Sequence, residues 1–205
     1  MTQTLYLVRH GETEWNRERR YQGRCDSPLT SAGREQARRV GRALRELIAD
    51  AGEYALVASP LGRARKTAGI VCEALGRAAD ACRSDPALAE MAWGDWEGRT
   101  AEEIERDEPW RWAERVRCKW SFVPPGGESY AMLAERVRRW LETVASEPPL
   151  IAITHSGFGR VLRGVHLGLT PDQVLALDGP HDTFFRLTPG RIASFAAAEK
   201  TRGRA

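Results

Sequence analysis

The chain of 205 residues is 42% hydrophobic, which is enough to bury the core of one domain, residues 1–205, without disulfide staples. Its formal charge of +3 comes from 31 basic and 28 acidic residues that are interspersed, whereas a nucleic-acid-binding protein usually shows a denser basic face. We expect no nucleic-acid partner, but composition alone does not separate that option from a smaller anionic partner. Because it has no apolar run of membrane-helix length, no basic signal-peptide region and no CxxC pair among its four cysteines, we expect a cytoplasmic protein with reduced thiols and no membrane partner.

The first predicted strand, residues 4–8, is a continuous apolar run of the kind that is buried on both faces of a sheet. Arg9 and His10 follow it directly, so a fixed cation and an imidazole lie at the end of the strand. A polar loop then extends to residue 29, and loops of this length without structure of their own are often functional. Apolar residues next recur at helical spacing over residues 30–50, which predicts an amphipathic helix.

A second apolar strand, residues 54–58, leads into Ser59 and Pro60. This pair predicts a helix that has the serine as its N-cap, the proline at its first position and an end near residue 76. Arg63 then lies in the first turn, where its own charge and the free backbone N–H groups both favour an anion. The segment is a second candidate anion site.

A helical insertion is expected at about residues 99–128, after a weaker strand over residues 81–84. A capping box opens the insertion, and Pro109 breaks or restarts its helix. Arg117 and Lys119 could bind a second anionic group of a ligand, but isolated cations usually belong to the solvated surface, and we interpret them in that way. The aromatic residues of this segment are interpreted as local core, namely Trp110, Trp112, Trp120 and Phe122.

The remaining chain contains another strand that ends in a histidine. Ser129 caps a predicted helix, and the buried-type strand over residues 150–154 ends at His155. Helical spacing resumes after it, a short helix begins at residue 170, and residues 183–195 form a hairpin. Alternating strands and helices indicate an α/β protein, with three α/β/α layers around a mostly parallel central sheet whose ligands bind at the carboxyl ends of the strands.

The predicted strand ends carry four side chains of one chemical character, namely Arg9, His10, Arg63 and His155. Neighbouring strands lie about 5 Å apart, so these side chains can converge on one small anion, and a phosphoryl group suits them. A metal site fits less well, because arginines repel a cation and no third ligand stands near. A serine hydrolase also fits poorly, because Ser156 is not part of a GxSxG elbow.

A series of motifs occurs between residues 5 and 157. They are Arg9-His10-Gly11-Glu12-Thr13, Trp15-Asn16, Pro28-Leu29-Thr30 with Gly33 and Gln36-Ala37, Ser59-Pro60-Leu61-Gly62-Arg63-Ala64 with Thr67-Ala68, Leu88-Ala89-Glu90, Gly94-Asp95-Trp96-Glu97-Gly98, Pro125-Gly126-Gly127-Glu128-Ser129 and Thr154-His155. In this order they resemble the histidine phosphatase superfamily, also called phosphoglycerate mutase-like. Ser156 stands where members commonly have glycine, and because the backbone N–H is retained we expect little loss.

The resemblance implies that His10 is a nucleophile that takes the phosphoryl group as phosphohistidine. Neighbouring arginines should lower its pKa and keep a lone pair available. Glu90 would protonate the leaving oxygen and then activate water, while its rivals Asp95 and Glu97 are interpreted as organisers of a tight turn. No metal or organic cofactor is implied. The catalytic residues implied are Arg9, His10, Arg63, Glu90 and His155.

Other residues are expected to bind the substrate. Asn16 would add a neutral donor, although asparagine also favours turns, and Gln22 either contacts the substrate or packs the loop. The substrate-binding residues expected are Arg9, Asn16, Gln22, Gly23, Arg63, His155 and Ser156.

The sequence therefore predicts a phosphomonoester hydrolase, of the histidine acid phosphatase type, that acts on a small phosphorylated metabolite. A mutase of the cofactor-dependent phosphoglycerate mutase type is the first alternative. It is disfavoured because the chain between Glu90 and His155 is short and lacks Arg-His-Tyr after the glutamate. A non-catalytic binder of phosphorylated ligands is the second alternative. The substrate and the oligomeric state, including a homodimer, are left open.

Overall fold

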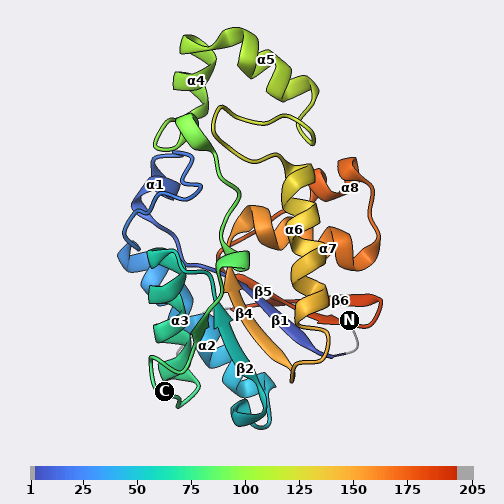
Figure 1. Cartoon of the computed structure of the whole chain (residues 1–205). Coiled ribbons are helices and arrows are strands. Elements are labelled where there is room, and N and C mark those ends of the chain that lie inside the picture. Colours follow the sequence, from blue (N-terminus) through green and yellow to red (C-terminus); the bar gives the residue numbers. More distant parts are fainter. Residues whose placement is uncertain (1–2, 198–205) are drawn as a thin grey trace.

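The computed structural model describes residues 3–197 as a six-stranded sheet between two layers of helices (Figure 1). The strand order is β3-β2-β4-β1-β5-β6, in which β5 alone pairs antiparallel with both of its neighbours. This confirms the predicted three-layer α/β fold with a mostly parallel sheet. The strands are β1 (Leu5–Arg9), β2 (Ala55–Ala58), β3 (Arg83–Ser84), β4 (Leu150–Thr154), β5 (Thr183–Thr188) and β6 (Arg191–Ala196).

The helices connect these strands and cover both faces of the sheet (Figure 1). Within residues 3–197, no helix combines the length and the apolar character that crossing a bilayer requires. The helices are α1 (Glu14–Arg17), α2 (Ser31–Leu47), α3 (Gly62–Ala74), α4 (Ala101–Asp107), α5 (Pro109–Arg117), α6 (Tyr130–Thr143), α7 (Ser156–Leu167) and α8 (Pro171–Ala176), with short 3-10 turns η1 (Ala51–Glu53), η2 (Pro86–Leu88) and η3 (Gly94–Trp96).

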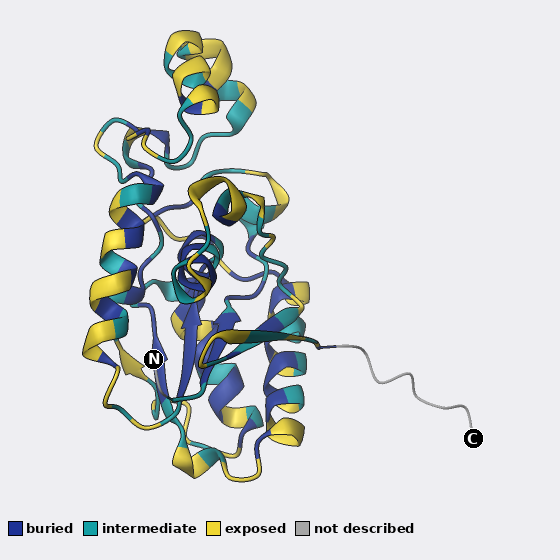
Figure 2. Ribbon diagram, turned by 90° about the vertical axis from the view of Figure 1, so that its right-hand side faces the viewer, coloured by how far each residue is buried: buried dark blue, intermediate teal, exposed yellow. Residues whose placement is uncertain are grey.

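The central strands send alternate side chains into two different cores. In β1, Leu5 and Leu7 pack in a core with side chains of α6 and α7, whereas Tyr6 and Val8 pack in a core with side chains of α2 and α3. Figure 2 shows the buried sheet in the middle of the molecule and exposed residues on the outer sides of the helices. Burial on both faces explains the continuous apolar sequence of the strand.

A crevice at the edge of the sheet is expected where the chain leaves the carboxyl ends of β1 and β4. The two strands are neighbours, but β1 continues towards α2 in one layer and β4 continues into α7 in the other. Such a switch point opens a crevice at the carboxyl ends of the strands. His10 follows β1 and His155 follows β4, and the N–H of His10 donates to the carbonyl of Thr154 at 2.9 Å. The predicted meeting of these strand ends is confirmed.

The loop after β1 differs from the prediction, because it contains the short helix α1. Thr13 and Asn16 form a capping box that starts this helix, a signal that the sequence analysis overlooked. The expectation of a long loop without structure of its own is therefore wrong for residues 14–17.

Helix α3 begins at Gly62, later than predicted, so Ser59 is not its N-cap. The Ser59 hydroxyl instead lies 2.7 Å from Nε2 of His155. Asp26, from the loop after β1, accepts hydrogen bonds from the first N–H groups of α3 and thus replaces the expected cap. Arg63 lies in the first turn of the helix, as predicted.

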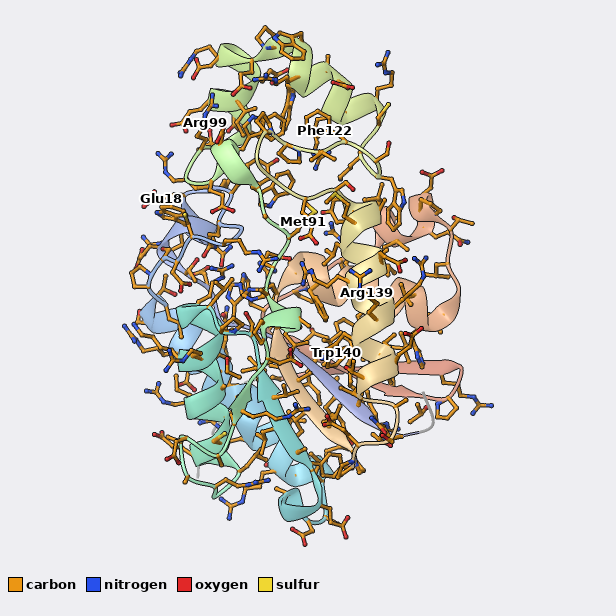
Figure 3. The ribbon with its side chains drawn as sticks, in the orientation of Figure 1. Glu18, Met91, Arg99, Phe122, Arg139 and Trp140 are labelled. Carbon is orange, nitrogen blue, oxygen red and sulfur yellow. The ribbon has the colours of Figure 1, made fainter. Side chains whose placement is uncertain are left out.

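Helices α4 and α5 belong to the predicted insertion and lie beyond the carboxyl ends of the strands (Figure 1). The predicted capping box and the restart at Pro109 are both confirmed. Phe122, in the loop below α5 (Figure 3), stacks on Trp96 with ring centroids 5.2 Å apart, as local core should. Trp110 is 64% exposed, so its assignment to the core is wrong. Its ring lies instead against the guanidinium of Arg111, at 4.5 Å from the ring centroid.

Candidate active site

His10 is buried at the end of β1, and its contacts fix one tautomer of the imidazole. Its Nδ1 atom lies 2.7 Å from the carbonyl oxygen of Gly11. Because a carbonyl oxygen only accepts hydrogen bonds, Nδ1 carries the proton and donates it. The opposite ring atom, Nε2, then keeps its lone pair for a ligand.

The loop that carries His10 packs backbone against backbone on α2. A Cβ atom on Gly11 would collide with the carbonyl of Gly33, and a Cβ atom on Gly33 would collide with the carbonyl of Glu12. Only glycine permits so close an approach at these positions. The N–H of Gly11 also donates to the Thr67 hydroxyl at 3.1 Å, which ties the same loop to α3.

His155 lies beside His10, with the ring centroids 5.1 Å apart. The Ser59 hydroxyl already accepts the N–H of Leu61 at 3.3 Å, so it can give its own proton to Nε2 of His155. In the tautomer in which the hydroxyl donates to Nε2, Nδ1 of His155 carries the proton, and this atom is buried without a hydrogen-bond partner. In that tautomer the two histidines differ, because His10 offers a lone pair and His155 offers an N–H donor.

Burial keeps both imidazoles neutral. The pKa of His10 lies well below its ordinary value, first because the ring is buried and then because His155, Arg63 and Arg9 add positive charge. The pKa of His155 is lowered by burial and then by the same two arginines. The effect of the arginines, predicted from the sequence, is present but is smaller than that of burial. A neutral imidazole retains the lone pair of a nucleophile.

Arg9 and Arg63 supply fixed cations close to the two histidines. The Arg63 guanidinium donates to the carbonyls of Cys25 at 2.6 Å and Gly23 at 2.8 Å, and it pairs with Asp26 at 3.0 Å. The pKa of Arg9 is lowered by burial to about 10, which still leaves it charged near neutral pH. The Nε atoms of both arginines are buried without a hydrogen-bond partner.

Glu90 closes the site from the side of the insertion. Its carboxyl group accepts the N–H groups of Gly157 at 2.9 Å and Phe158 at 3.0 Å, at the start of α7, and that of Met91 at 2.9 Å. The free N–H groups of a helix start thus hold the carboxyl in one orientation. A Cβ atom on Gly157 would approach Oε1 of Glu90 to 2.6 Å, so a larger residue at this position would displace the Glu90 carboxyl group.

The segment that carries Glu90 is held by an ion pair that the sequence analysis did not identify. Arg136 of α6 pairs with Glu128 at 2.8 Å and donates to the carbonyls of Ala87 at 2.7 Å and Ala89 at 2.8 Å. No local sequence pattern indicates these contacts, because Arg136 is separated from Ala89 by 47 positions and from Ala87 by 49. Arg136 therefore holds the residues just before Glu90, while the start of α7 holds its carboxyl group.

Glu97 organises a turn, as interpreted from the sequence, and it also fixes the loop before Asp26. Its carboxylate accepts the N–H groups of Arg24 at 2.8 Å, Cys25 at 2.9 Å and Trp93 at 3.0 Å. Although burial raises the pKa of Glu97, these donors lower it overall. The loop that contacts Arg63 is thus connected directly to the entrance of the insertion.

The remaining expected binding residues have local partners. Asn16 accepts the N–H of Thr13 at 3.1 Å within its capping box, and Gln22 donates to the Thr13 hydroxyl at 2.8 Å. Oε1 of Gln22 is buried without a partner, the carbonyl of Gly23 serves Arg63, and Ser156 is the first residue of α7. Contact of these residues with a substrate stays a prediction.

His181 is a neighbour of the site that the sequence analysis missed. Its Nδ1 atom lies 2.8 Å from the carbonyl of His10, and the two rings are 5.7 Å apart. Burial, followed by the charge of Arg9, lowers its pKa to about 4. The residue lies between α8 and β5 in a segment without periodicity, so no sequence signal pointed to it.

The geometry defines a pocket that can hold a small anion next to the lone pair on Nε2 of His10. The buried atoms without a partner include three donors in this cluster, at Arg9, Arg63 and His155, and the cost of leaving such donors unpaired is removed when an anion binds them. Over the part of the chain that is described, no three His, Cys, Asp or Glu side chains come together as metal ligands would. A phosphoryl group, with several acceptor oxygens and an electrophilic phosphorus, matches the set.

Comparison with known proteins agrees with this class of site. The model of the histidine phosphatase superfamily (branch 1) matches residues 5–190, and the chain belongs to this superfamily. Among curated relatives, "Probable phosphoglycerate mutase GpmB" of Salmonella paratyphi C is 37% identical over 180 residues, which cover 84% of this chain and 75% of the relative.

Solved structures share the fold over nearly the whole chain. The alpha-ribazole phosphatase of Shigella flexneri has a TM-score of 0.80 at 23% identity, and the match covers 94% of this chain and 95% of the other. A mycobacterial glucosyl-3-phosphoglycerate phosphatase in complex with VO3 has a TM-score of 0.76 at 28% identity, with 95% and 98% covered. YhfR of Bacillus stearothermophilus is 30% identical, with a TM-score of 0.76 and 95% and 96% covered.

The tautomer and charge of His10 can be tested by long-range proton–nitrogen NMR of the imidazoles. We expect Nδ1 protonated and Nε2 unprotonated between about pH 8 and 5.5, because a lowered pKa keeps the ring neutral below the ordinary value of about 6.5. His10→Gln assigns the signals, and the chain unfolded in urea supplies the reference titration. A His10 signal that titrates near the reference value would contradict the assignment.

Proposed function

We propose that this protein is a phosphomonoester hydrolase that transfers the phosphoryl group of a small phosphorylated metabolite to His10 and then to water. The observation that carries the proposal is the lone pair on Nε2 of His10, which faces a cluster of buried donors with no protein partner. Membership of the histidine phosphatase superfamily and the phosphatases among its structural neighbours support the same reaction class.

In the first step, Nε2 of His10 attacks phosphorus, so that a P–N bond forms while the P–O bond of the ester breaks. The leaving oxygen takes a proton from Glu90. Arg9, Arg63 and Nδ1 of His155 hold the non-bridging oxygens, and their fixed positive charge and donors stabilise the charge of the transition state. These donors are in place before the substrate binds, so little reorganisation is needed.

In the second step, the carboxylate of Glu90 takes a proton from water, and the resulting hydroxide attacks phosphorus. The P–N bond breaks, its electron pair returns to Nε2, and inorganic phosphate leaves. Glu90 is then protonated again and His10 is neutral, so the cycle closes without any other reactant. The three N–H groups that hold the Glu90 carboxyl support a single residue serving both steps from one position.

We also propose that the protein works in the cytoplasm on a soluble substrate. The four cysteines are free thiols and so fit a reducing compartment.

A phosphoenzyme intermediate is the direct test of the nucleophile. Rapid quenching with a labelled phosphomonoester should trap an acid-labile, base-stable label, and His10→Ala should abolish the label and lower kcat by about a thousandfold or more. His166→Gln is the matched control, because this histidine lies on the outer part of α7 against the carbonyl of Thr188. Binding without labelling, for every ester tried, would identify a non-catalytic binder instead.

The role of Glu90 can be tested through the leaving group. Glu90→Gln should slow phosphorylation of the enzyme by about 10²- to 10⁴-fold for an alkyl phosphate, which needs a proton on its leaving oxygen, and much less for p-nitrophenyl phosphate. Asp95→Asn, at the exposed rival carboxylate, is the control and should leave both rates unchanged. An equal loss on both substrates would argue against acid catalysis by Glu90.

A mutase is the second candidate, because curated relatives at 37% identity are named "Probable phosphoglycerate mutase". Hydrolysis predicts that 3-phosphoglycerate primed with 2,3-bisphosphoglycerate releases phosphate faster than it is isomerised, since the phosphoenzyme is attacked by water. Both products can be followed in one reaction by phosphorus NMR. Isomerisation that is much faster than phosphate release would reverse the order of the two candidates.

A further inference from the structure

The side chain of His181, in the segment between α8 and β5, contacts the main chain of His10. Nδ1 of His181 lies 2.8 Å from the carbonyl oxygen of His10, although the two residues are 171 positions apart in the sequence. Because a carbonyl oxygen only accepts hydrogen bonds, Nδ1 of His181 is the donor. The two rings meet edge to face, with an angle of 63° between their planes.

The carbonyl that accepts this hydrogen bond belongs to the peptide group that joins His10 to Gly11. The N–H of the same peptide group donates to the Thr67 hydroxyl at 3.1 Å, and Thr67 is fully buried on α3. The Thr67 hydroxyl in turn donates to the carbonyl of Arg63 at 2.9 Å. Two side chains from distant parts of the chain therefore hold the two polar ends of one peptide group.

The orientation of this peptide group affects the imidazole through the next residue. The carbonyl of Gly11 accepts the Nδ1 proton of His10 at 2.7 Å, and the N–H of Glu12, in the same peptide group as that carbonyl, donates to Gln36 at 2.8 Å. Glycine has no Cβ atom, so the peptide groups before and after Gly11 can rotate relative to each other more easily than at other residues. Without His181, the first of these peptide groups is held by a side chain at its N–H only.

The segment that carries His181 is itself held firmly against the site. The three consecutive carbonyls of residues 177–179 accept hydrogen bonds from Arg160, Arg163 and Arg9, respectively. Arg160 and Arg163 belong to α7, and Arg9 is the last residue of β1. One segment thus orients the guanidinium of Arg9 through a carbonyl and the main chain of the next residue through His181. A donor on a fixed segment can hold its acceptor in one place.

We propose that His181 is a positioning residue, which holds the peptide group between His10 and Gly11 so that the Gly11 carbonyl keeps the proton on Nδ1 of His10 and the lone pair on Nε2. This inference rests on the proposed function, in which that lone pair attacks phosphorus. An imidazole that turns or changes its tautomer presents the lone pair for only part of the time, so the chemical step slows while the groups that bind the phosphoryl oxygens stay in place.

A pair of substitutions at His181 separates the hydrogen bond from the bulk of the ring. His181→Ala removes the donor, whereas His181→Asn keeps one, because Nδ2 of asparagine occupies the place of Nδ1 of histidine. With p-nitrophenyl phosphate, we expect kcat of His181→Ala to fall about 10²-fold while KM changes by less than about threefold, and kcat of His181→Asn to stay within about threefold of the wild type. Asp182→Asn, at the exposed neighbouring residue, is the matched control and should leave both constants unchanged.

The imidazole NMR spectrum of His10 tests the same contact without any turnover. Wild type and His181→Asn should show one His10 tautomer, with the proton on Nδ1, and His181→Ala should show a mixture of both tautomers. This result is readable even if the wild type hydrolyses no ester, so failure of this inference is distinct from failure of the proposed function. Thermal unfolding checks that each variant is folded. A folded His181→Ala in which His10 keeps a single tautomer would overturn the proposal, whether or not its kcat falls.

Discussion

The parallel pairing of β1 with β4 is the constraint on which the site depends. It sets Arg9 opposite Thr154 in the register, so the next residues, His10 and His155, emerge side by side at one edge of the sheet. The 5.1 Å separation of their rings follows from the spacing of neighbouring strands rather than from any contact between the rings. Arg9 is the last residue of β1, and loops or helix ends bring the remaining groups of the pocket to this pair.

The buried polar groups around the two histidines lower the stability of the folded protein. Buried donors without partners, and imidazoles whose pKa values are lowered by burial, destabilise the empty protein, and the apolar cores on both faces of the sheet offset this. Carboxylates at Asp26, Glu97 and Glu128 stabilise the surrounding loops by accepting N–H groups or pairing with arginine. The acids thus hold the backbone and, through Asp26, also Arg63, while the Nε atoms of Arg9 and Arg63 stay available to a ligand.

Much of the fold and of the central site could be predicted because the signals are local. A continuous apolar run followed by a histidine marks a strand end, and helical spacing marks the helix after it, so His10 and His155 could be assigned to one edge of a sheet. Features that join distant segments could not be predicted in this way. Asp26 replaces Ser59 at the start of α3, and His181 lies against His10, only because the chain folds back on itself. Burial of a charge depends on the same tertiary contacts, which is why Lys119 is partly buried and its interpretation as a solvated surface cation is wrong.

The contact between Gly11 and Gly33 has a consequence for how such a protein can change over time. Two backbones meet there without side chains, so no substitution at a neighbouring position can compensate for an added methyl group. The loop that carries His10 thus meets α2 backbone to backbone, whereas the insertion packs through side chains such as Trp93 and Phe122. Side-chain packing in the insertion can be adjusted by a second substitution, while the contact that holds the His10 loop cannot.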